Sequence, residues 1–200
     1  MDLTQRLERV YAAIGETMTR EPEKLRPSIS RRPGVISISF DGGLSPAQLE
    51  NAAMQAVFHV AHLRDHLKRW AKAHQQNPSL VDEAVEASLA LKVLLDLANA
   101  DKHGGSARDG GFSGLSPTLT GVTRCLRLTG GPEPPVIEFP LSPSGEYMPG
   151  IQGDAAAVIT GDILDQGGNR IGDLNAFLVD GLGVFEQLLA AWMARNGEPA

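Results

Sequence analysis

The chain has 200 residues, of which 42% are hydrophobic and 21% are charged, so it is long enough and apolar enough to fold around a core. Its formal net charge of −6 resides entirely in residues 104–200, which have 5 basic and 11 acidic side chains, whereas residues 1–103 have 13 of each. This distribution excludes a general DNA-binding coat, because binding along phosphates needs clustered positive charge. A local basic strip on the neutral half stays open as a surface for RNA.

The expected location is the cytoplasm. The single cysteine, Cys125, leaves no internal disulfide, which fits a reducing compartment. No stretch approaches the roughly 18–20 apolar residues of a membrane span, so no membrane partner is expected. The amphipathic N-terminal pattern also lacks the basic start and unbroken apolar run of a signal peptide.

In chain order, residues 2–20 carry apolar side chains at three- and four-residue spacing, which predicts an amphipathic helix. The proline-rich stretch 21–34 is interpreted as a linker or surface crossing, because proline removes a backbone donor and stops helices. Residues 34–40 alternate apolar and small polar side chains, which is typical of a strand.

Two long helices are predicted next. The first begins at Ser45-Pro46, an N-cap followed by a proline in the first turn, and ends before Asn77-Pro78. Ser79 with Asp82 is interpreted as a capping box for the second helix, which ends at Gly104-Gly105. Because only about four residues connect them, the two helices are expected to be antiparallel neighbours.

The second half of the chain predicts a sheet followed by a helix. Short β-like runs occur at Val122–Leu128, Val136–Leu141 and Ala156–Leu164, and residues 166–169 form a hairpin-type turn. A closing helix follows from residue 173 to about residue 194, and part of its apolar stripe could serve a homodimer interface.

The fold class is therefore α+β: a mainly helical bundle of about four helices, with a small antiparallel β-sheet inserted before the C-terminal helix. We expect a single domain over residues 1–200. It comprises a helical half (1–104), a sheet-forming segment (105–170) and a C-terminal packing helix (171–196).

The two long helices carry polar strips that are expected to meet. His59, His62 and His66 fall at positions i, i+3 and i+7, which places them on one strip of the first helix. Asp96, Asn99 and His103 repeat this spacing on the second helix, with Lys102 beside them. Antiparallel packing then brings the two strips to similar depth.

Three interpretations of these strips stay open. They can be the structural network of a binding or assembly module, since Asp96 and Asn99 can satisfy histidine N–H groups. They can be the ligands of a metal-dependent enzyme, formed by the cluster His59, His62, His66 and His103 with Asp96, although no HExxH, cysteine-based or Glu-x-x-His pattern accompanies it. They can also supply metal-independent RNA cleavage, in which a histidine takes the 2′-hydroxyl proton and a cation stabilises the phosphorane. No motif implies a cofactor.

Arg69 and His74 are separated by four residues, and the helical pair resembles the HEPN superfamily. That resemblance implies a small helical bundle, commonly dimeric, and metal-independent endoribonuclease activity in toxin–antitoxin or phage-defence systems. The strings HLRDHLKRW (62–70) and DLANADKHG (96–104) are also similar to bacterial proteins carrying His-Leu-Arg-Asp-x-Leu and Asp-Leu-Ala-Asn-x-x-Lys-His on successive helices. This second resemblance covers about 50 of the 200 residues. The candidate catalytic residues are His62, Arg64, Asp65, Asn99, Lys102 and His103.

Overall fold

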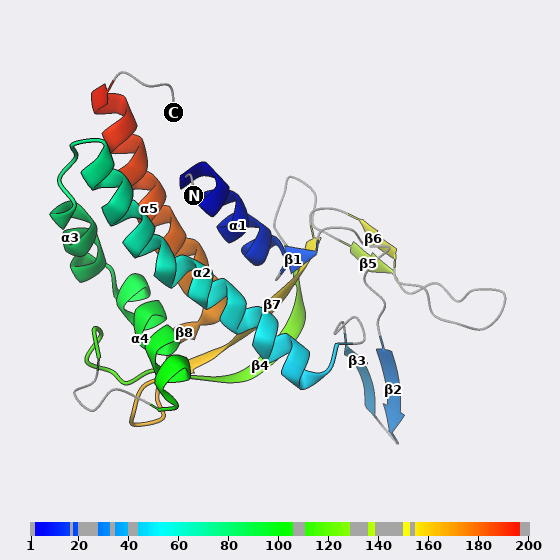
Figure 1. The fold of residues 1–200 in the computed structure, drawn as a ribbon. Helices are drawn as coiled ribbons and strands as arrows, with labels where there is room; N and C mark the ends of the chain where they lie inside the picture. Colours follow the sequence, from blue (N-terminus) through cyan, green and yellow to red (C-terminus); the bar gives the residue numbers. More distant parts are fainter. Residues whose placement is uncertain are drawn as a thin grey trace.

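The computed structural model describes residues 3–16, 18–19, 28–32, 35–39, 44–105, 111–128, 136–138, 150–152 and 155–196. Within these parts the fold is mainly helical α+β, as predicted (Figure 1). The helices are α1 (Leu3–Glu16), α2 (Pro46–Ala73), α3 (Ser79–Ala87), α4 (Leu89–His103) and α5 (Leu174–Asn196). The strands are β1 (Met18–Thr19), β2 (Ser28–Arg32), β3 (Val35–Ser39), β4 (Thr118–Leu128), β5 (Val136–Glu138), β6 (Gly150–Gln152), β7 (Ala155–Leu164) and β8 (Arg170–Asp173).

The main sheet is antiparallel and has β7 as its central strand. Strand β4 pairs along one edge of β7, while β1 and β8 pair with the other edge at different heights. The predicted hairpin turn joins β7 to β8, because the Asp165 carboxylate accepts hydrogen bonds from the backbone N–H groups of Gly167 and Asn169. The pairs β2–β3 and β5–β6 form two separate two-stranded sheets.

The predictions for the first helix, for the linker and for the start of one strand need correction. The first helix ends at Glu16, and residues 18–19 join the sheet as β1. The stretch interpreted as a linker contains β2, which pairs with the correctly predicted β3. Strand β4 begins four residues earlier than expected, at Thr118. Of the run Val136–Leu141, the first three residues form β5, and residues 139–141 lie outside the described residues.

Helix α2 is the central helix of the fold. It begins as predicted, because Ser45 and Gln48 form a reciprocal capping box and Pro46 occupies the first turn. One face of α2 is apolar and buried from Leu49 to Ala71, and α1, α4 and α5 pack against this helix. A short connection after α2 leads into α3, and α4 then runs back alongside α2 in the opposite direction (Figure 1).

The predicted second long helix is divided into two helices, α3 and α4, so the described parts of the chain contain five helices where about four were predicted. Ser88 has an extended backbone (φ −111, ψ 111), and its hydroxyl accepts a hydrogen bond from the Leu91 N–H. Ser88 therefore ends α3 and caps α4. The capping box expected at Ser79 is also wrong, since the N-cap of α3 is Pro78 and makes no side-chain hydrogen bond.

Helix α5 closes the core. Leu174, Leu178, Leu182, Phe185 and Trp192 are all buried, and α5 packs against α2, α3, α4 and β7. Residues Leu174–Ala194 of α5 are also long and apolar enough to cross a membrane, by length and composition alone. The core helix of a soluble protein can meet the same two criteria. The expectation that the protein has no membrane partner stays a prediction. The homodimer interface on this helix also stays a prediction.

Candidate functional site

A recess of about 170 Å³ opens between α2 and α4, and we name it the α2–α4 recess. It is lined by Phe58, Ala61, His62, Arg64, Asp65, Leu95, Ala98, Asn99, Lys102 and Phe112. Five of the six candidate residues from the sequence are among them. The sixth, His103, is exposed at the end of α4 and does not line the recess.

Helix geometry explains why these residues meet. On α2 the lining residues from 58 to 65 recur at three- and four-residue intervals, and those on α4 from 95 to 102 do the same. Because the helices run in opposite directions, Phe58 lies toward the Lys102 end and Asp65 toward the Leu95 end. Of the two predicted strips, His62 and Asn99 therefore meet at the recess, with Lys102 beside them. The other members, His59, His66, Asp96 and His103, do not line it.

Asp96 has a different neighbour from the one that the sequence suggests. Its side chain is 5% exposed and accepts hydrogen bonds from the Phe112 N–H (2.7 Å), the Ser113 N–H (2.8 Å) and the Ser113 hydroxyl (2.6 Å). The backbone of Gly111 approaches so closely that a Cβ there would lie 2.1 Å from Asp96 Oδ1. Asp96 therefore fixes the loop of residues 111–115 to α4 and does not satisfy the histidines.

This loop supplies an aromatic ring that sequence reasoning missed. Phe112 is 40% exposed and forms one side of the recess. The Arg64 guanidinium carbon lies 5.5 Å from the centre of the Phe112 ring, which is a cation–π arrangement. The signal in the sequence is weak, because Phe112 stands in a glycine-rich segment that resembles any flexible turn.

Arg64 is also bound by a carboxylate of α3. Asp82 of α3 accepts hydrogen bonds from Arg64 Nε (3.1 Å) and Nη2 (2.6 Å), and from Lys68 Nζ (2.6 Å). These hydrogen bonds hold the pKa of the Asp82 carboxyl below its usual value, and the bond from Lys68 has the larger influence. Asp82 thus orients the two cations and is not part of a helix cap.

The remaining polar side chains of the recess lie nearer to solvent. His62, Asp65, Asn99 and Lys102 are all exposed, and the His62 ring stacks on Phe58 with 5.9 Å between ring centres. Lys102 makes no ion pair with any residue in the described parts of the chain. The recess therefore offers an ammonium group, an amide and an imidazole beside two aromatic rings.

The four histidines of the proposed metal cluster do not converge. His66 is half-buried beside Arg69, with 3.3 Å between His66 Nδ1 and Arg69 Nη2, whereas His103 is exposed at the far end of α4. Among the described residues, no group of three or more histidine, cysteine or acidic side chains could hold a metal ion. The geometry thus gives no support to the metal interpretation.

Arg69 and His74, the pair behind the HEPN resemblance, contact different neighbours. Arg69 donates from Nε to the Asp65 carbonyl oxygen (3.2 Å) and contacts His66. His74 stacks on Trp70 at 4.2 Å between ring centres, and Trp70 in turn stacks on the buried Trp192. His74 thus takes part in the packing at the end of α2.

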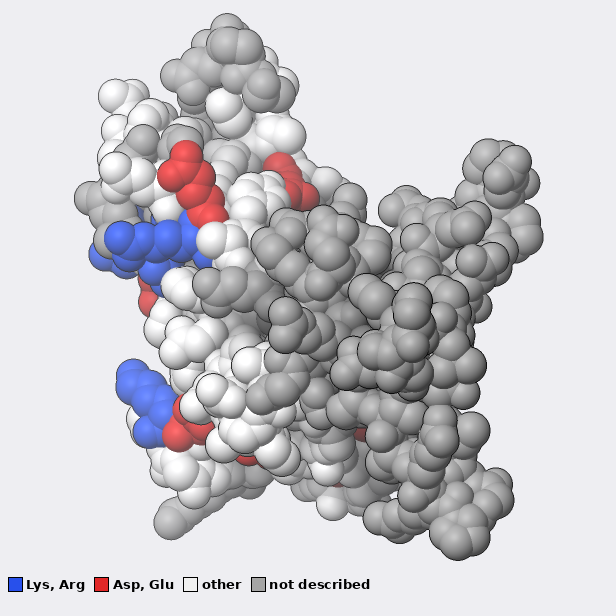
Figure 2. All heavy atoms as spheres, turned by 90° about the vertical axis from the view of Figure 1, so that its right-hand side faces the viewer, with Lys and Arg blue, Asp and Glu red and all other residues white. Residues whose placement is uncertain are grey.

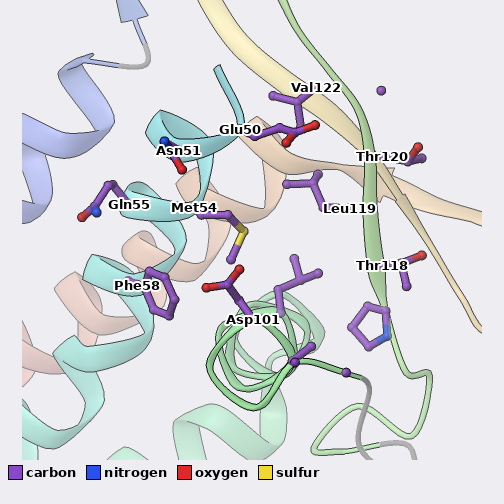
Figure 3. Close-up of a pocket in the computed structure, with 16 residues that line it drawn as sticks. Glu50, Asn51, Met54, Gln55, Phe58, Asp101, Thr118, Leu119, Thr120 and Val122 are labelled. Atoms are coloured by element: carbon purple, nitrogen blue, oxygen red, sulfur yellow. The ribbon is translucent and has the colours of Figure 1, made fainter. Parts of the chain in front are cut away.

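A larger groove of about 770 Å³ lies next to the recess, between α2, the end of α4 and β4. Figure 3 shows Met54 from α2, Asp101 from α4 and Leu119 from β4 pointing into it. Glu50 and Asp101 are its only charged lining residues among those described, so the groove is acidic. Phe58 lines both the groove and the recess and separates them.

Comparison with protein-family models, with curated proteins and with solved structures finds no match to this chain.

Proposed function

We propose that the protein is a binding module and that the α2–α4 recess binds a nucleotide, either free or as one unit of single-stranded RNA. The observation that carries this proposal is Phe112: an exposed aromatic ring beside the Arg64 guanidinium, on a loop fixed by a buried carboxylate. An ordered aromatic ring at a polar recess is a stacking surface that is available before the ligand arrives.

The groups around Phe112 match the parts of a nucleotide. A base can stack on the open face of the ring, because every base has an aromatic face. Lys102 can pair with a phosphate, since its ammonium group is exposed at the rim. The Asn99 amide can both donate to and accept from a base edge, which is how single-stranded bases are read.

Binding is favoured over cleavage by the way the cations and histidines are held. RNA cleavage needs a base and a cation that converge on one 2′-hydroxyl and its phosphate. Arg64 is instead paired with Asp82 and packed on Phe112. The His62 ring stacks on Phe58, and His103 does not line the recess.

The charges visible among the described residues of one face favour one nucleotide over a long nucleic-acid track. In the face seen in Figure 2, the described Lys and Arg side chains gather in two groups at one edge, each with Asp or Glu beside it. Within the recess, Asp65 offsets part of the charge of Arg64 and Lys102. Affinity should therefore depend on stacking and hydrogen bonds, and only weakly on salt.

The test is a binding titration with two probes, adenosine 5′-monophosphate and a labelled single-stranded RNA of about twelve nucleotides. We expect Phe112→Ala to weaken binding about 5- to 150-fold, the equivalent of the roughly 1–3 kcal/mol that one stacked base contributes. Lys102→Gln should weaken it too. Leu89→Ala and Lys92→Gln are matched controls on α4, outside the recess, and should bind as the wild type does.

The two probes separate a free nucleotide from an RNA unit as the natural ligand. Failure of the wild type to bind either probe would sink the proposal, as would unchanged binding by both recess variants. RNA cleavage that is lost in His62→Ala or Lys102→Gln would replace the binding module by the ribonuclease interpretation.

A further inference from the structure

A second polar feature lies where α1 packs on α2, and its three members, Arg6, His66 and Arg69, do not line the recess. Arg6 of α1 is only 9% exposed. Its Nε atom is buried and has no hydrogen-bond partner in the described parts of the chain. A buried guanidinium normally has a carboxylate partner, because removing an unpaired charge from water is costly.

The groups around Arg6 are basic as well. Burial and then the charges of Arg9 and Arg69 lower the pKa of the Arg6 guanidinium. Burial and then the charges of Arg6 and Arg69 lower the pKa of His66 below its usual value. Asp65 is the one carboxylate among the described residues that opposes the shift of His66.

The hydrogen-bonding state of His66 adds a donor to this cluster. With its pKa lowered, the imidazole is neutral at pH 7. Arg69 Nη2 can only donate, so His66 Nδ1, 3.3 Å away, is the acceptor. The remaining ring nitrogen, Nε2, then carries the proton and can donate to a further group.

We propose that Arg6, His66 and Arg69 form an oxyanion site that takes a phosphate group, either free or in a nucleic-acid backbone. Such an anion gives the buried Arg6 a partner, relieves the repulsion between the arginines, and accepts the His66 Nε2–H. Arginine is suited to this role because its planar guanidinium binds phosphate through two donors at once.

The site goes beyond the nucleotide proposed for the recess, but α2 connects the two. His62, His66 and Arg69 lie at positions i, i+4 and i+7 on one face of this helix. At 1.5 Å per residue, Arg69 lies about 10 Å along the helix from His62. A polynucleotide with one base at Phe112 could therefore place a phosphate at Arg69.

Thermal unfolding of the full chain in sodium phosphate and in sodium chloride of equal ionic strength tests the site. We expect phosphate to raise the midpoint of the wild type above its value in chloride. For Arg6→Gln and for Arg69→Gln, the phosphate concentration needed for the same rise of the midpoint should be at least about tenfold higher, because each substitution removes charge-assisted hydrogen bonds. Lys92→Gln on α4 is the matched control and should respond fully.

A purely structural arginine would give a different pattern. In chloride, Arg6→Gln should be at least as stable as the wild type, because it removes a buried guanidinium whose Nε has no hydrogen-bond partner among the described residues. In phosphate, the order of the two proteins should reverse. Equal midpoints of the wild type in the two salts, a full phosphate response in both variants, or the same loss of stability for Arg6→Gln in both salts would each overturn the proposal. Arg69→Gln, at an exposed position, carries the test if Arg6→Gln does not fold.

The same variants distinguish the two sources of phosphate. If Arg6→Gln weakens the binding of the twelve-nucleotide RNA as well as of inorganic phosphate, the site holds a backbone phosphate. If it weakens only the response to inorganic phosphate, the site holds a free anion.

Discussion

The loop that carries Phe112 is held by Asp96, and the strength of this attachment can be measured. Asp96 accepts three hydrogen bonds from Phe112 and Ser113, at 2.6–2.8 Å. A hydrogen bond to a charged group contributes about 1.5–3 kcal/mol, but the freed donors can be rehydrated because Phe112 is exposed and Ser113 half-buried. We therefore expect Asp96→Ala to lower the free energy of unfolding by about 3 kcal/mol.

A substitution at Gly111 tests the same attachment, because the backbone of Gly111 lies against the Asp96 carboxylate. A Cβ at Gly111 would lie 2.1 Å from Asp96 Oδ1, so Gly111→Ala must push the loop off the carboxylate. The backbone of Gly111 is also left-handed (φ +70), which costs an alanine about 1 kcal/mol more. Gly114 is the matched control, because its φ is +73 and no atom lies within 4 Å of its Cβ position. Gly114→Ala should therefore cost only about 1 kcal/mol.

A double-mutant cycle isolates the contact. Once Asp96→Ala has removed the carboxylate, Gly111→Ala should cost only its backbone strain of about 1 kcal/mol. The coupling between the two positions should then reach about 2–3 kcal/mol, measured by urea-induced unfolding followed by circular dichroism. If the losses of unfolding free energy in the two single variants add up to that of the double variant within about 0.5 kcal/mol, this account of the loop is refuted.

Two further predictions concern α1 and α5. The Tyr11 hydroxyl donates to Glu186, which raises the pKa of the phenol to about 12. Because this pKa is raised in the folded state, the contact stabilises the fold below the unfolded pKa near 10, and the stabilisation is lost as the pH rises toward 12. The free energy of unfolding of Tyr11→Phe should therefore depend less on pH than that of the wild type between about pH 10 and 12. An unchanged pH dependence would contradict the contact. A Cβ at Gly181 would lie 2.9 Å from Leu94 Cδ1, whereas Gly183 has no atom within 4 Å. Gly183→Ala should thus stabilise α5 by up to about 1 kcal/mol and Gly181→Ala destabilise it, and equal midpoints of thermal unfolding would contradict this.

Local patterns in the sequence were sufficient where short-range physics decides the structure. The start of α2 was predictable because Ser45, Pro46 and Gln48 act within one helical turn. The break at Ser88 was not, because apolar residues continue on both sides of it at helical spacing. Its cap was hidden in that pattern, since serine is tolerated within helices as well as at their ends.

The candidate site shows the same division between local and long-range information. The spacing of polar residues on two antiparallel helices was enough to predict that His62 and Asn99 would meet, and both line the recess. The position of Phe112 depends on Asp96, sixteen residues away, and no periodicity connects the two. The burial of Arg6 likewise follows from the docking of α1 onto α2, which a helical pattern alone does not specify.

Helix α2 gives the two proposed sites a common face but different supports. The recess depends on Phe112, which Asp96 of α4 holds in place, whereas the oxyanion site depends on Arg6, which α1 brings to α2. His62 and His66, one helical turn apart, belong to different sites, and the charge of His62 lowers the pKa of His66, after burial and the two arginines. Loss of the loop would therefore remove the stacking surface and leave the arginines in place, so the two proposals can fail separately. A phosphate response without nucleotide binding would assign the chemistry of this face to α1 and α2 alone.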